Sequence, residues 1–214
     1  MSEQLDRQIA RFLLDLLPPG RPRRLARMSF PGELLRDGTP RDKYQDIKDK
    51  QLTLAMLAEH VRGGKTYSYT LDKDGKAREG AIDIDAGGQP ALLAALRVAA
   101  ELGVTAFAVK NDAGGKHKGG HFRALFDASY PVAHIRALML TIAEQAGLGA
   151  VEIWPQNQGL RGLFGFHQVD QTRGQLLLQS GEIIKLDDDL AAGFAAVRAL
   201  PLNSAPPAPP EPEP

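Results

Sequence analysis

Apolar residues recur every three or four positions in several parts of the chain, the spacing that places them on one face of a helix. The pattern is strong in residues 3–17, and Pro18-Pro19-Gly20 ends it. The sequence therefore predicts an amphipathic helix at the N-terminus. By the same criteria we predict four more helices, over residues 52–62, 90–102, 131–145 and 187–200.

The segments between the helices alternate apolar and polar residues, which is typical of β-strands with one buried face. We expect the first two strands to form a hairpin around Lys73-Asp74-Gly75-Lys76, because Asp-Gly is a favoured hairpin turn. Helices scattered among strands that follow one another directly predict an α+β fold, with a mixed or antiparallel sheet flanked by helices and an N-terminal helical extension. The predicted strands are residues 66–71, 79–85, 105–110, 121–126, 150–154, 163–167, 175–179 and 182–185.

Composition divides the 214 residues into three parts. Residues 1–50 combine the first helix with a basic stretch, broken by Pro and Gly, that we expect to be irregular. Residues 51–202 are the main domain, and residues 203–214 are a Pro-rich tail that we expect to be disordered. Lys and Arg balance Asp and Glu at 26 each, so the net charge does not indicate a nucleic-acid partner. Basic residues nevertheless concentrate in residues 21–50 and 110–123, and local patches of this kind can bind phosphates.

The composition also excludes several classes of protein and site. The chain has no cysteine, which rules out disulfides and thiolate zinc sites. No apolar run approaches the roughly 18–20 residues of a membrane span, and the N-terminus lacks the basic and apolar regions of a secretory signal. We therefore expect a cytoplasmic protein with no membrane partner.

The strand predicted at residues 79–85 carries a pair of carboxylates. Asp83 and Asp85 lie two positions apart, so a strand places both on one face and puts Ile82 and Ile84 on the other. Asp is disfavoured inside strands, and neighbouring like charges repel unless a cation lies between them. Paired carboxylates favour a hard divalent cation, Mg²⁺ or Mn²⁺. Ordinary polar surface is the alternative interpretation.

A Gly- and Lys-rich loop precedes the strand predicted at residues 121–126. Glycine pairs on both sides of Lys116-His117-Lys118 allow the backbone to approach an anion closely, while the side chains supply positive charge. The spacing is not that of a Walker P-loop. The pattern indicates a polyphosphate site, and a flexible basic hairpin tip is the alternative. His121 begins the strand itself, and Arg123 shares its face.

Together these residues resemble the archaeo-eukaryotic primase and primase-polymerase superfamily, in particular the primase domains of bacterial conflict and mobile-element systems. The first motif of that family is a hydrophobic strand that ends in Asp-x-Asp, to which Ala81-Ile82-Asp83-Ile84-Asp85 is similar. Its second motif is a Gly-rich turn that leads to a histidine on a strand, and Lys118 and His121 stand in the matching places. The resemblance covers residues 50–185.

The resemblance implies a DNA primase-polymerase, with residues 51–202 as the catalytic domain. Its reaction would be the metal-dependent, template-directed transfer of a nucleotide to a 3′-hydroxyl. Asp83, Asp85 and His121 would be the catalytic residues, and the two aspartates would hold Mg²⁺ or Mn²⁺. Lys118 and His121 would bind the nucleoside triphosphate, with Lys116 and Arg123 as helpers. The other ligand would be a single-stranded template or primer, and a helicase or nuclease is the kind of protein that such a domain serves.

The third family motif, a strand that ends in a metal-binding Asp, is where the sequence departs from the pattern. The strand in that place is residues 175–179, so Gln179 occupies the acidic position, and Asp170 or Glu182 could supply the ligand instead. Whether the chain is an enzyme therefore stays open at this point, although the other motifs favour one. The alternatives are a primase fold that binds nucleotide or single-stranded nucleic acid without extending it, and a metal-dependent glycosyltransferase.

Three other side chains have simpler structural interpretations. Trp154, before Pro155, could stack a base, but packing in the core is the more ordinary role. His60 and His134 lie on predicted helices, and we interpret them as surface or boundary residues.

Overall fold

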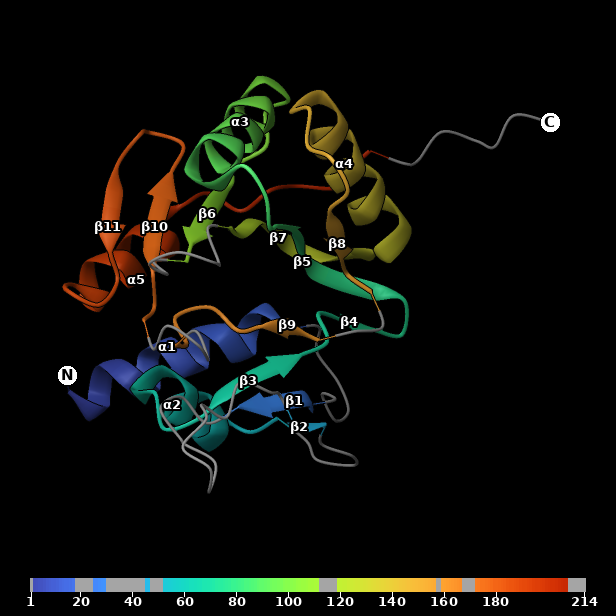
Figure 1. Cartoon of the computed structure of the whole chain (residues 1–214). Helices are drawn as coiled ribbons and strands as arrows, with labels where there is room; N and C mark the ends of the chain where they lie inside the picture. Colours follow the sequence, from blue (N-terminus) through green and yellow to red (C-terminus); the bar gives the residue numbers. More distant parts are fainter. Residues whose placement is uncertain are drawn as a thin grey trace, which may run out of the picture.

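The chain folds into two antiparallel sheets with helices packed around them, as the computed structural model in Figure 1 shows. The structure describes residues 2–17, 25–29, 45–46, 52–111, 119–156, 159–166 and 172–207, with the backbone alone for 25–29 and 45–46. Within these residues the helices are α1 (Glu3–Leu16), α2 (Leu54–Arg62), α3 (Gly88–Glu101), α4 (Val132–Gln145) and α5 (Leu190–Ala199). The strands are β1 (Leu25–Ser29), β2 (Gln45–Asp46), β3 (Thr66–Tyr69), β4 (Asp72–Lys73), β5 (Lys76–Ile84), β6 (Phe107–Lys110), β7 (Gly120–Pro131), β8 (Glu152–Trp154), β9 (Leu160–Arg161), β10 (Gln175–Leu178) and β11 (Ile183–Lys185).

The five predicted helices are all present, and capping residues explain where their ends differ from the prediction. The predicted helix over 52–62 begins later because Thr53 is the N-cap, with its hydroxyl accepting from the Met56 N–H at 3.2 Å. It ends at Gly63, whose φ of 88° lies in the left-handed region. Asp189 caps the last helix in the same way, through the Ala192 N–H at 2.8 Å. Because of these capping hydrogen bonds, the two helices begin two and three residues later than the apolar periodicity predicted.

The larger sheet carries the order β11-β10-β6-β7-β5-β4, and β8 pairs with β5 on the same edge as β4. Each of these pairings is antiparallel. Helices α3 and α4 cover one face of this sheet (Figure 1). The predicted α+β fold, an antiparallel sheet flanked by helices, is therefore confirmed.

The two faces of the larger sheet have different surroundings because successive strand residues point in opposite directions. Ile82 and Phe122 pack beneath α3 and α4 in one apolar cluster. Ala81, Phe107 and Leu176 belong to a second cluster, which also includes residues of α1, α2 and α5. Burying a side chain such as Phe or Leu contributes about 1.5–3 kcal/mol. Both faces are therefore held by packing, and Asp83 lies on the second one.

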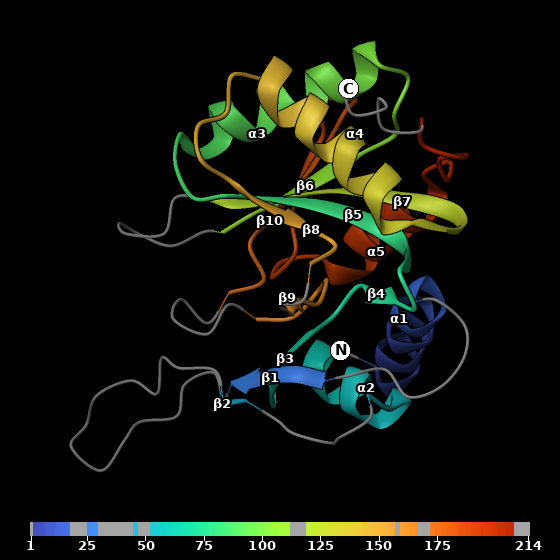
Figure 2. The same ribbon diagram turned by 90° about the vertical axis from the view of Figure 1, so that its right-hand side faces the viewer.

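The smaller sheet has the order β2-β1-β3-β9 and lies on the far side of the larger sheet from α3 and α4 (Figures 1 and 2). Strand β1, which we predicted to be irregular chain, pairs with β3. A domain boundary at residue 50 would therefore cut through this sheet. The described parts of residues 1–50 belong to the fold, because the apolar face of α1 and the strand β1 both find their partners after residue 50.

The predicted hairpin exists, but its first strand is β4. Asp74 and Gly75 have φ of 52° and 72°, the two positive values that a type I′ turn needs, and they join β4 to β5. Strand β3 pairs instead with β1 and β9 in the smaller sheet. The alternating pattern identified β3 as a strand but could not identify its partners. The strand predicted at 163–167 is likewise replaced by β9, three residues earlier.

Asn203, which we placed in the disordered tail, is part of the domain. Its backbone forms a parallel bridge with Phe126, and its side-chain amide donates to the carbonyls of Thr105 and Leu125, each at 2.8 Å. Residues 208–214 lie outside the described residues. Every helix in the described part of the chain is too short or too polar to traverse a lipid bilayer.

Candidate functional site

Asp83 and His121 lie side by side in the larger sheet. Asp83 is near the end of β5, and His121 is near the start of β7. They are directly opposite each other in the antiparallel pair of β5 and β7, so their side chains share a face. The Oδ1 atom of Asp83 lies 3.4 Å from Nε2 of His121. Asp85 follows the last residue of β5 and is exposed. The rigid sheet thus brings together the two sequence motifs that were predicted to share a site.

A third carboxylate, Glu152, lies on the other side of Asp83. The register of β5 and β8 puts Glu152 directly across from Asp83, so it shares the face of Asp83 and His121. This residue was not predicted from the sequence, because β8 is only three residues long. The signal was present in the alternation of Val151-Glu152-Ile153, which places one acid between two apolar residues that point to the opposite face.

The surroundings of Asp83 strongly favour its protonated form. Its side chain is only 26% exposed, and burial together with the negative charges of Asp85 and Glu152 raises the pKa of Asp83 to about 7. The positive charges of Arg161 and Arg123 act in the opposite direction on this pKa but do not outweigh the other effects. Three carboxylates therefore share a small region without enough positive charge to balance them.

The chemistry of these donors fits a hard divalent cation, because all three are carboxylates and oxygen is the ligand that Mg²⁺ and Mn²⁺ prefer. Within the described residues, no three His, Cys, Asp or Glu side chains converge closely enough to hold a metal ion by themselves. Mg²⁺ commonly uses one or two carboxylates and completes its shell with water and substrate phosphates. The arrangement fits that mode of binding, with Asp83 and Asp85 as the pair, rather than a cage built of protein ligands.

Gly119 brings the end of the Gly- and Lys-rich segment to this edge of the sheet. A Cβ atom on Gly119 would overlap the Ile84 carbonyl oxygen and would lie 2.8 Å from Cα of Asp85, so only glycine fits there. The Gly119 carbonyl accepts from the Asn111 N–H at 3.0 Å, which closes the loop at its base. Residues 112–118, including the predicted ligands Lys116 and Lys118, lie outside the described residues. The described ends of the loop lie beside Asp85.

Arg123 is too buried to contact a nucleotide in the way the sequence suggested. It is 1% exposed, and its Nη1 donates to Glu79 Oε1 at 2.5 Å. Its Nη2 donates to the Arg161 carbonyl and lies 3.4 Å from Nδ1 of His121. The expectation that Arg123 helps to bind the triphosphate directly is therefore corrected, because its donors are directed at groups of the protein.

Arg161, which was not predicted from the sequence, brings positive charge from the smaller sheet. It lies on β9, and its Nη2 donates to the Asn111 side-chain oxygen at 2.7 Å, at the end of β6. Its charge acts on the pKa of Asp83, which places the guanidinium within electrostatic range of the carboxylates. Sequence spacing could not reveal this, because Arg161 and Asp83 belong to different sheets.

Gln179 is not at this site, so the departure from the third family motif has a different explanation. Its Nε2 donates to the carbonyls of Leu96 at 3.2 Å and Val104 at 2.8 Å, and its Oε1 accepts from the Ala106 N–H at 3.1 Å. These partners belong to α3 and the connection between α3 and β6, on the helix-covered face. Gln179 is a structural residue that satisfies backbone groups.

Leu176 of β10 pairs with Val109 of β6, and Val109 pairs with His121 of β7. The position of β10 in register with Asp83 is therefore occupied by a leucine and not by an acid. Glu182 lies in the turn between β10 and β11, where its carbonyl accepts from the Leu178 N–H at 3.0 Å. It is therefore no substitute ligand. Asp170, the other possible substitute, lies outside the described residues. The third carboxylate comes from β8, on the opposite edge of β5 from β7.

His60 is completely buried, so our interpretation of it as a surface or boundary residue was wrong. Its Nδ1 accepts from the Tyr67 N–H at 3.0 Å, and its Nε2 lies 3.2 Å from the Leu163 carbonyl oxygen. One ring nitrogen accepts and the other donates, which is the pattern of a neutral imidazole. Burial lowers the pKa of His60 to about 4. Trp154 is also buried, which confirms the interpretation of core packing.

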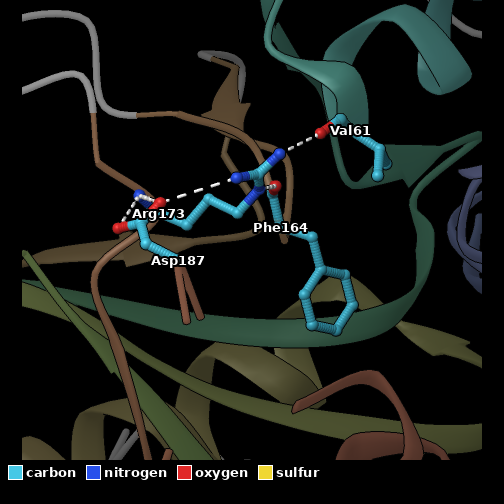
Figure 3. A network of polar contacts seen from close by, with 4 residues as sticks. All are labelled: Val61, Phe164, Arg173 and Asp187. Carbon is cyan, nitrogen blue, oxygen red and sulfur yellow. Dashed lines mark hydrogen bonds and ion pairs between the residues drawn. The ribbon is translucent and has the colours of Figure 1, made fainter. Parts of the chain in front are cut away.

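The buried side chain of Arg173 forms a second polar network (Figure 3), which includes the carbonyl of Val61, the residue after His60. Its Nη2 donates to the Val61 carbonyl at 2.6 Å, its Nε donates to the Phe164 carbonyl at 3.2 Å, and Nη1 lies 3.5 Å from Asp187 Oδ1. The guanidinium also stacks 3.8 Å from the centre of the Phe166 ring. We refer to Arg173, Asp187 and these partners as the Arg173 clamp. It joins α2, the segment after β9 and the turn between β11 and α5.

A separate cavity of about 880 Å³ lies between α1 and α5. Phe12 and Phe194 form part of its lining, with Arg7, Arg11 and Arg198 around them. None of the predicted site residues lines this cavity, and it has no carboxylate pair on a rigid strand. The carboxylate site on the larger sheet is therefore the better candidate for chemistry.

No family model and no curated protein matches the chain. Among solved structures, the chain is similar to the AEP domain of the primase-polymerase (PrimPol) of cyanophage S-2L. The TM-score is 0.47 and the sequence identity 16%, over 87% of this chain and 96% of that chain. A likeness at this level establishes neither a family nor a function, so the residues of the site carry the proposal that follows.

Proposed function

We propose that the chain is a metal-dependent nucleotidyltransferase of the primase-polymerase type, which transfers a nucleotide to a 3′-hydroxyl on a single-stranded template. The observation that carries the proposal is Asp83 on a rigid sheet, with His121 and Glu152 paired beside it on the same face and the charge of Asp85 acting on it from just beyond the end of β5. Burial and the charges of Asp85 and Glu152 raise the pKa of Asp83 to about 7, and a perturbed carboxyl of this kind supports a functional role for the site.

Asp83 and Asp85 would hold Mg²⁺ or Mn²⁺, with Glu152 strengthening the negative field around them. When bound, the metal would polarise the α-phosphate and favour the ionised form of the attacking hydroxyl. The work of the chain's own residues is to place the nucleotide. His121 lies 3.4 Å from Asp83 and can donate to a phosphate oxygen beside it. Arg161 offsets negative charge from the opposite sheet.

In this proposal, the basic side chains of residues 112–118 would complete the nucleotide site. Gly119 keeps the backbone at the base of the loop close to Asp85, and Lys118 is its direct neighbour along the chain. Lys116 and Lys118 would then neutralise the β- and γ-phosphates. A triphosphate would lie beside His121, with its α-phosphate towards Asp83.

The alternative of a primase fold that binds without extending rested on the apparent loss of an acid at Gln179. That support disappears, because Gln179 faces α3 and Glu152 supplies a third carboxylate next to Asp83. No observation favours a glycosyltransferase, since the chain has no nucleotide-binding α/β unit before β5 within the described residues. Catalytic transfer is the proposal that the arrangement of carboxylates supports best.

The test is primer extension and de novo priming with all four NTPs or dNTPs, in Mg²⁺ and separately in Mn²⁺. We expect extension that is lost by at least about a thousandfold in the double variant Asp83→Asn/Asp85→Asn, because removing the charges removes metal binding. The matched control is Asp188→Asn, an exposed carboxylate in the turn before α5. Absence of extension with either metal and either nucleotide type in the wild type would overturn the proposal.

A further inference from the structure

We propose that Arg123, with Glu79 behind it, is a positioning residue that orients two side chains of the candidate site at once. It holds His121 with Nε2–H facing Asp83, and it ties the backbone of Arg161 to the larger sheet. The inference rests on the proposed function only for the nature of the substrate. The orientation of His121 is a property of the free protein and can be measured without any ligand.

The first observation is that Arg123 and Glu79 form an ion pair inside the protein. They are 1% and 3% exposed, and their Nη1 and Oε1 atoms are 2.5 Å apart. Burying two charges costs several kcal/mol per ion, so such a pair rarely stabilises a fold more than apolar residues of the same size would. A buried pair directly beneath a group of functional side chains therefore suggests a role in orienting them.

The second observation concerns the proton on His121. The Nη2 of Arg123 lies 3.4 Å from His121 Nδ1, in a hydrogen bond. A guanidinium can only donate, so Nδ1 must accept and the ring proton must be on Nε2. Nε2 is the nitrogen that faces Asp83 at 3.4 Å. Arg123 therefore decides that the imidazole presents a donor, rather than an acceptor, to the place where a phosphate would bind.

The third observation is that the same guanidinium reaches the other sheet. Its Nη2 also donates to the Arg161 carbonyl on β9. Strand β9 has two residues and pairs only with β3 among the described strands. The Arg161 side chain then extends to Asn111 at the end of β6. Through one side chain, Arg123 therefore contacts both His121 and the strand that carries Arg161.

The charge on Glu79 is part of this arrangement. Without it, Arg123 would carry an uncompensated positive charge in a buried position, which is strongly destabilising. Glu79 lies on β5 four residues before Asp83, and it is across from Leu125 of β7. It therefore anchors the guanidinium at one end while the other end reaches His121 and Arg161.

The test uses the double variant Arg123→Met/Glu79→Gln, which removes both charges and keeps the volume similar, so that no buried charge is left alone. The readout is the tautomer of His121, from the ¹⁵N chemical shifts of the imidazole nitrogens at about pH 8.5, well above the ordinary pKa of histidine. The signal is assigned by its loss in His121→Gln. The matched control is Arg173→Met, which removes another buried arginine without touching His121.

We expect wild-type His121 to be entirely in the Nε2–H form, with Nδ1 shifted as an acceptor. In the double variant the nitrogens should move towards the mixture shown by a free imidazole, while Arg173→Met leaves them unchanged. In extension assays the double variant should raise KM for the nucleotide about 10- to 100-fold, the usual range for residues that orient a ligand. The loss in kcat should be smaller than the rise in KM.

A dominant Nδ1–H form in the wild type would overturn the proposal, even if the double variant did not fold. Unchanged His121 nitrogens in a folded double variant would overturn it as well. If the tautomer responds as expected but the wild type neither binds nor extends nucleotides, the positioning role stands and the proposed function fails. The two inferences can thus be told apart in one set of samples.

Discussion

Two polar clusters within the same domain differ in how their charges are matched. In the Arg173 clamp the guanidinium donates to two carbonyls and pairs with Asp187 (Figure 3). It also stacks on Phe166. At the candidate site, Asp83 has two carboxylates near it, and the nearest positive charges do not offset them. The first cluster pairs a buried positive charge with an opposite charge at the surface, whereas the second gathers like charges and is partly open to solvent.

The difference separates structural from functional use of charge. A buried polar group that has all its partners holds segments in place, and removing one partner is costly. A group of like charges on a rigid strand destabilises the free protein, so it needs another reason to be there, such as a cation. The same α+β domain thus contains one polar cluster that stabilises it and one that costs stability. Five measurements test this contrast between the two clusters.

The largest effect is expected from Arg173→Met. The change leaves the Val61 and Phe164 carbonyls without their donor and removes the partner of Asp187. We expect the free energy of unfolding to fall by about 3–5 kcal/mol, measured by urea denaturation. The control is Arg198→Met, an exposed arginine on α5, which should change stability by less than about 0.5 kcal/mol. A similar small change in Arg173→Met would mean that the clamp is not structural.

The second effect is the acid sensitivity of His60. Its pKa is about 4 in the folded state and 6.5 for an unperturbed histidine, so the unfolded chain binds more protons between these values. The stability that neutral His60 contributes is complete above pH 6.5 and is lost as the pH falls towards 4, by about 3 kcal/mol. The measurement is the free energy of unfolding of wild type minus His60→Asn across this range. A difference that does not vary with pH would contradict the prediction.

Gln179→Glu is expected to cost about 2 kcal/mol of stability. The carboxylate cannot donate to the Leu96 and Val104 carbonyls, and it places a negative charge next to them. Extension activity per folded molecule should not rise, because the side chain faces α3. Gln8→Glu on the exposed side of α1 is the control for the change of charge. A gain in activity would instead place Gln179 at the metal site.

Asp83→Asn should stabilise the protein, in contrast to the changes above. Because the pKa of Asp83 is raised to about 7, the folded state holds a proton that the unfolded state has lost between about pH 4 and 7. The contribution of Asp83 to the free energy of unfolding of the wild type therefore falls as the pH rises from about 4 to about 7. We expect Asp83→Asn to be more stable by about 1–3 kcal/mol at pH 8 and to lose this advantage at pH 4. A destabilised variant at pH 8 would show that Asp83 is a structural residue.

The smallest effect is expected from Glu152→Gln. Glu152 adds to the negative field at Asp83 from across the strand pair, so its loss should weaken binding of Mn²⁺ about tenfold, or about 1.4 kcal/mol. Calorimetric titration with Mn²⁺ measures the change. Glu144→Gln, an exposed carboxylate near the end of α4, is the control. Equal affinities in the two variants would remove Glu152 from the site.

Much of the candidate site was visible in the sequence because its parts are local. The two-residue period of β5 places Asp83 and Asp85 near one edge, and the glycines before His121 indicate where the loop ends. The same period misassigned Gln179, because a strand of four residues gives no information about which face is covered by helices. Arg123 was expected at the ligand, since a pattern of alternation gives the face but not the depth of burial.

From the sequence we could predict the five helices, most of the strands, the α+β class and the paired carboxylates. These properties follow from spacing within one segment, where each residue's neighbours are set by the chain. The tertiary structure alone decided that β3 joins β1 and β9, that Glu152 stands across from Asp83, and that Arg123 lies behind His121. Strand pairing and burial depend on which distant segments meet, and that is settled by packing of the whole chain.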